Sequence, residues 1–554
     1  MEKRVILAFV LSFIVLILWS YLFSPRQEQV PKSGDDSAEK EMPKTEFELP
    51  KPPVESAPAV AGRTVSTETE AKAKEKEIAI DTPLYRAVFI NAGPTIRSFR
   101  LKKYRKTTDP NSPFIDLVSL EKDMGDFFLA GFDSQAITRS EKLIFQVEPL
   151  SIQLGPESPH KDLVFRAMTP SGLSVHQIYR FYPNQYKIDL DINVVNQSGE
   201  PVNGAFEVSL RAVPPKDKKS YYSYVGFILL LDEKLNEVKI KKASEEKALD
   251  GQIGWMAYED DFFIMAVIPG ENSEGSFTGR LGASGVLEGR YLQPNESLGQ
   301  TEEASSSYTL YLGPRDLGIL KKLGKNLEKA INFGWFDIIA KPLLHLLRFF
   351  NRYIHNYGVS IILLTILVKI LFWPLTHKSY KSMKEMQKLQ PIMAKMREKY
   401  KDNKAQMNKE MMALYKTYKV NPMGGCLPMV IQIPVFFALF RILGTAIELR
   451  HAPFALWIDD LSAPDRLFNF PFQIPFMSPP YGIPVLTLLM GASMFIQQKM
   501  TPTPGDPTQA KIMLFLPIIF TFMFINFPSG LVLYWLVNNI LSIGQQYRIS
   551  KKRG

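Results

Sequence analysis

The feature that most constrains this chain is a set of apolar runs that are long enough, or nearly so, to cross a lipid bilayer. A helix needs roughly 20 mostly apolar residues to span the hydrocarbon core. The first run, residues 5–23, carries no charged residue and follows Lys3 and Arg4. Five more candidate spans lie at about 358–375, 427–447, 482–498, 512–527 and 529–546. The sequence therefore predicts an all-α polytopic membrane bundle with six transmembrane helices.

The N-terminal run resembles a signal sequence but is longer than a typical signal-peptide core and is followed by Ser24-Pro25-Arg26, without a small-x-small cleavage site. We expect an N-terminal transmembrane anchor over residues 1–23, with a cleaved signal peptide as the alternative. Residues 24–77 are rich in Pro, Glu, Lys, Ser and Ala. Because such a composition buries little apolar surface, we expect a disordered periplasmic tether there.

Residues 78–314 change to a period of two. Tyr186, Ile188 and Leu190 alternate with Lys187 and Asp189, as in a half-buried strand. Turn signals separate several such runs, so this segment predicts a periplasmic antiparallel β-sandwich. Carboxylates cluster at residues 259–261. We interpret them as a solvated loop rather than as the acid pair of a sugar hydrolase, since charged runs are usually exposed.

Residues 315–357 are expected to hold connecting and interfacial amphipathic helices. Polar residues recur three or four apart along one stripe of an otherwise apolar stretch, at Asp337, Lys341, His345, Arg348 and Arg352. This spacing favours a helix that lies in the membrane interface. A surface helix of the sandwich is the alternative.

Residues 358–554 form the predicted core, and their charges indicate its topology. Residues 377–422 hold twelve Lys or Arg and four acids, a net charge of +8, and the C-terminal tail adds four basic residues. The loop 448–480 has only Arg450 and Arg466 as basic residues. Cytoplasmic loops carry an excess of Lys and Arg. We therefore expect both termini, 377–422 and 500–511 in the cytoplasm, with the β-sandwich in the periplasm.

The segment 377–422 is predicted to be a cytoplasmic helical hairpin. Methionines recur at helical spacing on both sides of a turn at Asp402-Asn403, and Pro391 is expected to interrupt the first arm or to begin a new helix. Flexible thioethers suit a surface that receives varied apolar clients, but also an ordinary hairpin seam, which we favour slightly. The candidate methionines are Met383, Met386, Met407 and Met411. The lysines suit a solvated face, ribosomal RNA or anionic lipid equally well.

Polar residues inside the predicted spans indicate a hydrophilic pocket within the bundle. Lys369 lies about eleven residues from the outer end of its span, roughly 16 Å deep at about 1.5 Å per residue. A lysine there costs about 2.5–3.5 kcal/mol, and the cytoplasmic face is beyond comfortable snorkelling reach. Thr365, Gln432 and Asn538 add polar groups, and further ones follow in the last span at Asn539, Ser542, Gln545 and Gln546. The alternative for some of these last residues, near the cytoplasmic end, is that they simply face water.

Catalytic and metal-binding motifs are not found in the sequence. One cysteine, Cys426, excludes an internal disulfide framework, and the six histidines show no ligand spacing. The sequence contains no Gly-x-Ser-x-Gly elbow, P-loop or His-Glu-x-x-His motif. We expect no enzymatic activity, no cofactor and no metal.

Four stretches closely resemble the YidC membrane protein insertases, of the bacterial, mitochondrial and chloroplast insertase family: 411–416 (MMALYK), 420–428 (VNPMGGCLP), 448–458 (ELRHAPFALWI) and 527–534 (FPSGLVLY). The resemblance covers nearly the whole chain and implies the Gram-negative form, in which five core helices surround a groove open to cytoplasm and lipid. It implies that Lys369 stands where the family commonly has an arginine. It also implies that Thr365, Tyr534 and Trp535 contact an incoming client helix.

The resemblance thus implies an insertase and chaperone of the inner membrane, with nascent membrane proteins, the Sec translocon, the ribosome and lipids as partners. Ribosomal RNA is the only nucleic acid that the basic charges suggest. A polytopic small-solute transporter is the alternative, because it would also need intramembrane polar residues. An anchored periplasmic enzyme is a third interpretation, but it leaves the basic hairpin unexplained.

Overall fold

The computed structural model describes residues 75–118, 120, 126–134, 143–214, 224–240, 242, 245–270, 274–282, 284–418, 420, 427–501 and 507–551. The predicted anchor, 1–23, lies outside the described residues. So does the predicted tether, apart from its last three residues, of which Glu77 already begins a strand.

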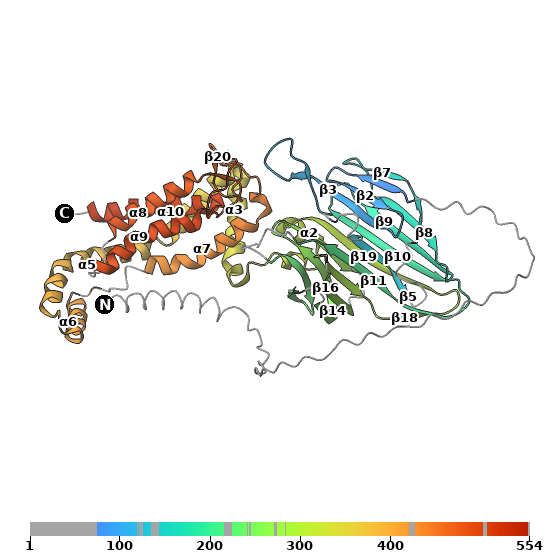
Figure 1. The fold of residues 1–554 in the computed structure, drawn as a ribbon, viewed down its shortest axis with the longest axis horizontal. Helices are drawn as coiled ribbons and strands as arrows, with labels where there is room; N and C mark the ends of the chain where they lie inside the picture. The colour runs from blue at the N-terminus through green and yellow to red at the C-terminus, as the bar shows by residue number, and fades with distance from the viewer. Residues whose placement is uncertain are drawn as a thin grey trace, which may run out of the picture. The chain divides into compact units, whose positions relative to one another are not determined.

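The first part of the described chain is rich in β structure (Figure 1). Its smaller sheet has the order β4 (Phe114–Asp116), β3 (Thr95–Arg105), β2 (Tyr85–Ile90), β1 (Glu77–Asp81) and β7 (Ser151–Gln153). Its larger sheet has 14 strands among the described residues. The main path runs β18 (Glu296–Leu298), β11 (Val202–Ala212), β17 (Leu287–Leu292), β16 (Glu274–Leu281), β14 (Glu246–Glu259), β15 (Phe263–Pro269), β19 (Glu303–Pro314), β10 (Lys187–Asn196), β9 (Leu173–Phe181), β8 (Lys161–Met168) and β6 (Gln146–Glu148). Off this path lie β12 (Gly226–Leu231), β13 (Lys234–Val238) and β5 (Phe128–Ser134).

The period of two explains how these strands bury one face. In β10, Ile188, Leu190 and Ile192 are buried, whereas Lys187 and Asp189 are only partly so. The two sheets meet through aromatic rings: the Phe89 ring of β2 has its centroid 5.1 Å from that of Tyr179 and 5.7 Å from that of Phe181 in β9. The predicted β-rich domain is confirmed. Its strands pair antiparallel, except that β1 and β7 pair parallel.

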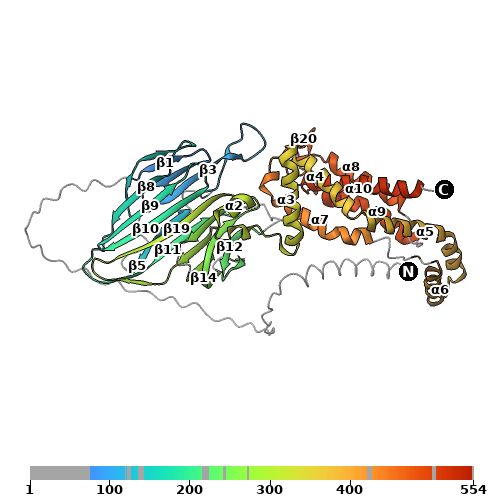
Figure 2. The same cartoon turned by 180° about the vertical axis from the view of Figure 1, so that it is seen from behind.

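The second part of the described chain is helical, and Figure 2 shows it from behind. The elements are α2 (Leu317–Leu323), η2 (Leu327–Ala330), η3 (Gly334–Phe336), α3 (Asp337–Ile354), α4 (Tyr357–Leu371), α5 (Trp373–Lys399), α6 (Lys404–Thr417), α7 (Leu427–Thr445), η5 (Ile447–Leu449), β20 (Leu467–Phe470), β21 (Tyr481–Ile483), α8 (Val485–Met500), α9 (Pro507–Phe524) and α10 (Ser529–Lys551). In both views α7, α8, α9 and α10 run alongside one another.

The predicted amphipathic helix is present as α3, which begins at Asp337, the first residue of the predicted polar stripe. Ala340, Leu344 and Leu347 form its buried face, while Lys341 pairs with Asp337 at 2.6 Å on the partly exposed flank of the helix. The structure does not test whether this helix lies in a membrane interface.

The predicted span 358–375 is not one straight helix. Helix α4 ends at Leu371, and α5 begins at Trp373 after a bend of 66°. Pro374 lies in the first turn of α5, where a proline is accommodated because its missing N–H has no helical partner there. Among the described helices, no single one is long and apolar enough to cross a membrane, whereas α4 and α5 together are, as a bent pair.

The outer surface of these helices is nevertheless strongly apolar. Large side chains are exposed on α9, at Phe515, Ile518, Ile519 and Phe522, and on α8, at Leu488, Leu489 and Ile496. A soluble surface rarely carries so much contiguous apolar area. Polar residues lie instead inside the bundle. This distribution is the reverse of that in a water-soluble protein, and the candidate site lies among these inner polar residues.

Candidate functional site

Lys369 is the central residue of the site. It is carried by α4, an apolar helix, and is only 8% exposed. Its Nζ donates to Ser542 Oγ at 2.6 Å and to Asn538 Oδ1 at 3.3 Å, both on α10. Among the described residues no carboxylate forms an ion pair with this lysine. The buried ammonium is therefore stabilised by neutral oxygens, which leaves its positive charge available.

A small cavity of about 20 Å³ lies beside the lysine. Its lining combines apolar and polar side chains from α4, α5, the bend between them, α7 and α10: Val368, Lys369, Phe372, Leu375, Thr376, Ile431, Gln432 and Asn538. This volume is enough for about one water molecule. The predicted hydrophilic pocket thus corresponds, in this conformation, to a narrow polar gap between the helices.

Helix α10 supplies most of the polar groups. Five of its residues share one buried face at helical spacing: Asn538, Asn539, Ser542, Gln545 and Gln546. Asn539 Nδ2 donates to Ser493 Oγ of α8 at 3.0 Å, and Gln545 Nε2 donates to Thr376 Oγ1 of α5 at 3.0 Å. The alternative that some of these residues simply face water does not hold in this structure, because α4, α5 and α8 cover this face.

The other predicted groove residues lie at the edges of this network. Gln432 Nε2 donates to the Tyr534 hydroxyl at 3.1 Å, which joins α7 to α10. Thr365 is buried and donates to the Ile361 carbonyl of its own helix at 2.7 Å. Its hydroxyl is thus already satisfied within α4.

Trp535 belongs to an aromatic cluster next to this network. Its ring centroid lies 4.9 Å from that of Phe436 in α7 and 5.3 Å from that of Phe524 in α9. The cluster forms an apolar wall adjoining the polar face of α10.

Two partner residues were not among the polar residues predicted for the pocket: Thr376 and Ser493. Ser542 was among them, and it follows Asn538 by four residues, so helical periodicity places both on one face of α10. Thr376 lies beyond the bend at Phe372, and no sequence signal indicates that the bend directs it back towards α10.

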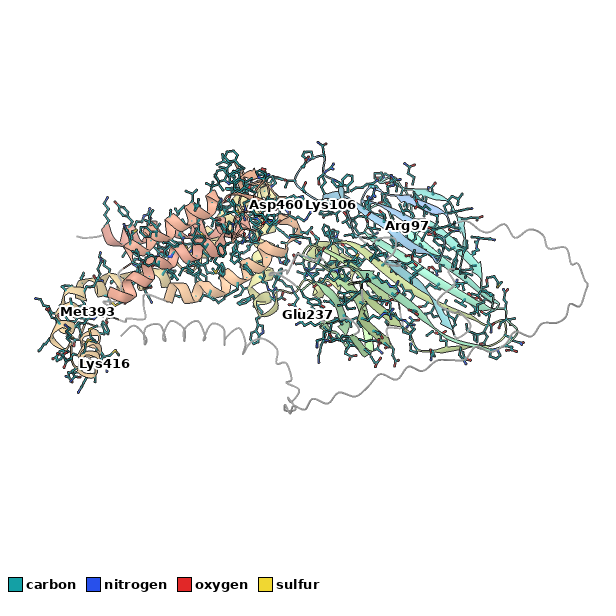
Figure 3. The ribbon with its side chains drawn as sticks, in the orientation of Figure 1. Arg97, Lys106, Glu237, Met393, Lys416 and Asp460 are labelled. Atoms are coloured by element: carbon teal, nitrogen blue, oxygen red, sulfur yellow. The ribbon has the colours of Figure 1, made fainter. Side chains whose placement is uncertain are left out.

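The helical hairpin is formed by α5 and α6, and Asn403 caps its second arm by accepting from the Gln406 N–H at 3.0 Å. The prediction that Pro391 interrupts the first arm is wrong, since α5 continues through it. Because Pro391 has no N–H, the helical hydrogen bond to the carbonyl of Gln387, four residues earlier, is not formed. Figure 3 labels one residue of each arm, Met393 and Lys416.

Three of the four candidate methionines are buried, and the fourth, Met407, is partly buried. Met386 and Met411 are buried in a cluster with Met393, against which Met407 packs, and Met383 is buried as well. This arrangement favours a hairpin seam. Contact with a client would require the arms to separate.

The acidic cluster of the β domain is not the solvated loop that we expected. Glu259 is buried at the end of β14, and Arg315 Nη2 lies 3.1 Å from its Oε2. Burial raises the pKa of Glu259 to about 8, against the opposite effect of Arg315. The neighbouring Asp260 is also well covered, and its Oδ1 accepts from the Phe263 N–H at 2.7 Å. These carboxylates therefore hold the end of the strand in place.

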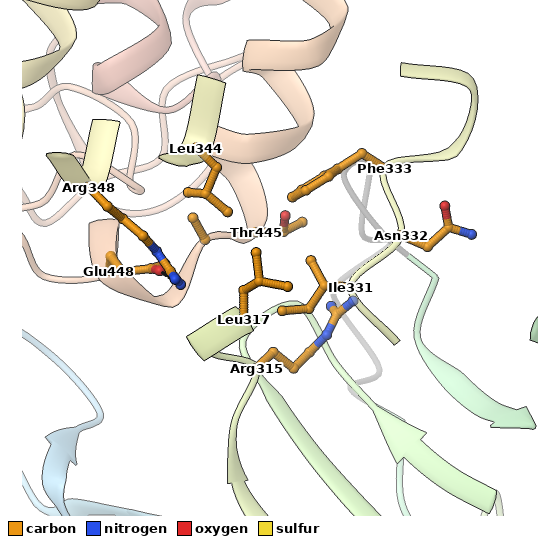
Figure 4. A pocket seen from close by; sticks show the side chains of 10 residues that line it. Arg315, Leu317, Ile331, Asn332, Phe333, Leu344, Arg348, Thr445 and Glu448 are labelled. Carbon is orange, nitrogen blue, oxygen red and sulfur yellow. Dashed lines mark ion pairs between the residues drawn. The ribbon is translucent and has the colours of Figure 1, made fainter. Parts of the chain in front are cut away.

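A second pocket lies nearby, where Arg348 faces Glu448 (Figure 4). The two side chains form an ion pair, and Arg348 also lies 3.4 Å from Asp316. At about 10 Å³ this pocket is too small for a polypeptide segment. In the part of the chain that the structure describes, no group of three or more His, Cys, Asp or Glu residues is arranged to hold a metal.

Together, the fold and the site define a class: a helical protein with an apolar outer surface and a polar interior, joined to a β-rich domain. Residues 77–346 match the family model described as the YidC periplasmic domain, and residues 349–554 match the one described as the 60Kd inner membrane protein.

Curated relatives agree over the full length. The membrane protein insertase YidC of Syntrophus aciditrophicus is 44% identical, with 100% of each chain covered. That of Geobacter metallireducens is 42% identical, with 100% of this chain and 98% of the relative covered. A solved structure of an active YidC insertase covers 87% of this chain and 93% of its own, at a TM-score of 0.37 and 18% identity. This chain belongs to the YidC family of membrane protein insertases. The comparisons do not support the alternative of a small-solute transporter.

Proposed function

We propose that this protein inserts clients into the Gram-negative inner membrane and helps them fold, using the polar face of α10 and Lys369 as the receiving groove. The observation that carries the proposal is the buried Lys369 ammonium, held by Ser542 and Asn538 within helices whose outer surface is apolar. A buried charge within an apolar helix bundle is energetically costly, and an ionisable residue in such a position usually marks a functional site.

The groove lowers the barrier that a client's polar flanking segment meets in the hydrocarbon core. An unpaired polar group transferred into an apolar medium costs several kcal/mol, roughly 2–7. Asn538, Gln432 and Gln545 exchange their hydrogen bonds to Lys369, Tyr534 and Thr376 for bonds to the client. The client's apolar helix then passes along the aromatic wall at Trp535 into lipid. Partitioning of that helix supplies the driving force, so no nucleotide is required.

The charge distribution supports a topology with both termini and the α5–α6 hairpin in the cytoplasm. The hairpin segment has a net charge of +8, whereas the loop between α7 and α8 has two basic residues. We assign residues 1–23 to an anchor, 24–77 to a tether, 78–314 to the periplasmic domain, 315–357 to connecting and interfacial helices and 358–554 to the core. Six crossings satisfy this arrangement.

The same topology suggests the partners. Nascent membrane proteins are the clients, delivered from the side on which the basic hairpin lies. The ribosome and anionic lipid headgroups both suit its lysines, and the Sec translocon is a neighbour in the membrane for clients too complex for this protein alone. The periplasmic domain has no recognisable chemistry and is proposed to be dispensable for insertion itself.

Reconstitution into liposomes tests the proposal. A variant with Lys369→Met, Asn538→Leu and Ser542→Ala replaces the polar network by apolar side chains, which often leaves stability nearly unchanged. We expect client insertion to fall at least about tenfold, whereas the control Ile518→Leu on the exposed face of α9 should retain it. Unchanged insertion by the folded triple variant would contradict the groove. Solute flux without client insertion would favour a transporter.

A further inference from the structure

The loop between α7 and α8 carries an exposed aromatic surface that the insertion groove does not use. Residues 467–483, here called the outer hairpin, contain β20 and β21 and no charged residue; the next charge after Arg466 is Lys499. Phe468, Phe472 and Phe476 are 67%, 59% and 86% exposed. Phe470 stacks on Phe472, with centroids 5.3 Å apart. Three exposed phenylalanines in one charge-free segment are unusual for a surface that faces only water.

The backbone holds two of these rings in an unfavourable conformation. Phe468 has φ +62° and Phe476 has φ +63°. A bulky residue in the left-handed region costs about 1–2 kcal/mol and persists only where the surroundings impose it. Because both rings are largely exposed, their own packing does not impose this conformation, and the surrounding backbone must hold it in place.

The base of the outer hairpin is fixed by a dense set of hydrogen bonds. The Arg466 guanidinium donates to the Pro480 and Ile525 carbonyls, each at 2.8 Å, and to Asn526 Oδ1 at 3.1 Å. Asn526 also donates to the Phe476 carbonyl at 2.9 Å. These contacts tie the outer hairpin to the turn between α9 and α10.

A second anchor holds the start of α8. Asp465 Oδ1 accepts from Trp457 Nε1 at 2.6 Å, and Asp465 Oδ2 accepts from the Thr487 N–H at 3.3 Å. The outer hairpin is therefore a platform fixed to the start of α8 and to the turn between α9 and α10, and the rings of Phe468, Phe472 and Phe476 remain exposed on it.

The aromatic surface continues the apolar outer face of the helices. Ile483 and Leu488 are exposed where α8 begins, and Phe522 and Met523 are exposed where α9 ends. The end of α9 adjoins the turn to which the outer hairpin is fixed, and α8 follows strand β21 of the outer hairpin directly. A charge-free patch of phenylalanines beside apolar helix ends suits the bilayer interface, where apolar faces with Trp, Phe and Leu are buried. A protein partner would require polar groups at the rim of the patch.

We propose that the outer hairpin is a membrane-interface anchor: Phe468, Phe472 and Phe476 insert into the lipid leaflet opposite the α5–α6 hairpin and fix the depth of α8, α9 and α10. Its occupant is the phospholipid interface. The proposal rests on the membrane placement of the proposed function, but not on the role of Lys369. A fixed depth matters because it keeps the polar groups of α10 at a constant level relative to the surrounding lipid.

Spin-label accessibility tests this anchor in the full chain. In a Cys426→Ser background, nitroxides are placed at positions 468, 472 and 476 by cysteine substitution, and the protein is reconstituted into phosphatidylethanolamine–phosphatidylglycerol liposomes. We expect collisions with oxygen to exceed those with a water-soluble nickel chelate at all three positions. A label at Phe515 provides the lipid-exposed reference, and one at Leu150 on the β domain the water-exposed reference. Water-like accessibility at the three positions, with a lipid-like signal at 515, would overturn the proposal.

A matched variant separates the rings from the backbone that carries them. Phe468→Asn with Phe476→Asn removes both rings, while asparagine tolerates a positive φ and preserves the fold. We expect the oxygen accessibility of a label at 472 to fall at least twofold and that at 515 to stay constant. Unchanged oxygen accessibility of the label at 472 would refute lipid anchoring. So would a lipid-like accessibility that arises only when a client or the translocon is added. Client insertion measured on the same samples shows separately whether the groove functions.

Discussion

Reversal of the charge at Lys369 provides the sharpest test of how the groove selects clients. The ammonium is held against α10 by Ser542 at 2.6 Å and Asn538 at 3.3 Å. We expect Lys369→Glu to impair clients whose translocated segment is acidic and to spare clients whose segment is basic. Lys369→Arg should preserve activity, because the charge remains and the adjacent cavity of about 20 Å³ gives the larger head some room.

The expected size of the effect follows from the Coulomb interaction between the enclosed charge at Lys369 and a charge on the client. Two unit charges about 8 Å apart, at an effective dielectric constant of about 20, interact by about 2 kcal/mol. Reversal turns attraction into repulsion, and about 1.4 kcal/mol corresponds to a tenfold change. Water entering with the client reduces this value. The acidic-to-basic insertion ratio should therefore fall at least about tenfold for Lys369→Glu, and only about two- to threefold for Lys369→Ala, since Gln432 and Asn538 remain polar.

The assay compares two clients that differ only in the charge of the translocated tail, in liposomes that contain equal amounts of each variant. Protease protection of the tail measures insertion, and a thermal melt in detergent verifies folding. If the folded Glu variant inserted both clients equally, Lys369 would have no electrostatic role. Loss of both clients to the same extent would mean that the lysine only maintains the groove.

Four further outcomes are expected from other parts of the chain. Reporter fusions after Lys404 and after Asp465 should report cytoplasm and periplasm respectively, and a periplasmic signal at the first site would contradict the topology. A stably expressed chain without residues 78–314 should retain most insertion activity in liposomes; its complete loss would show that the β domain is required. Deletion of the α5–α6 hairpin should slow client capture and weaken ribosome association, measured by cosedimentation, and if neither changed the hairpin would be purely structural. Burial raises the pKa of Glu259 to about 8, so between about pH 5 and 8 the folded state holds a proton that the unfolded state has released, and the stability of the fold should decrease as pH rises through this range. Glu259→Gln should flatten this pH dependence of the melting temperature, and an equally steep slope in the variant would refute the prediction.

Local periodicity predicted much of this fold. The alternation at 186–190 predicted strand β10, the stripe from Asp337 to Arg352 predicted α3, and the turn at Asp402-Asn403 separated α5 from α6. Each of these features is a short-range pattern, because it depends on which face of a single element must be buried. The motifs at 420–428 and 448–458 likewise indicated the family before any contact was known.

The sequence also identified Lys369 as anomalous, since one charge within an apolar run is visible without a structure. Its partners were decided by tertiary packing: Ser542 lies 173 positions away in the chain, and no periodicity links α4 to α10. Thr376 reaches Gln545 only because the chain bends by 66° after Leu371.

Burial was the second property that packing alone decided. Glu259 reads as a surface acid among its acidic neighbours, yet Arg315, 56 positions further along the chain, lies beside it in the interior. The methionines of the α5–α6 hairpin have the same spacing whether they face a client or one another, and only the packing of the two arms turns them inward. Periodicity determines which residues share a face, whereas what covers that face depends on contacts between elements far apart in the chain.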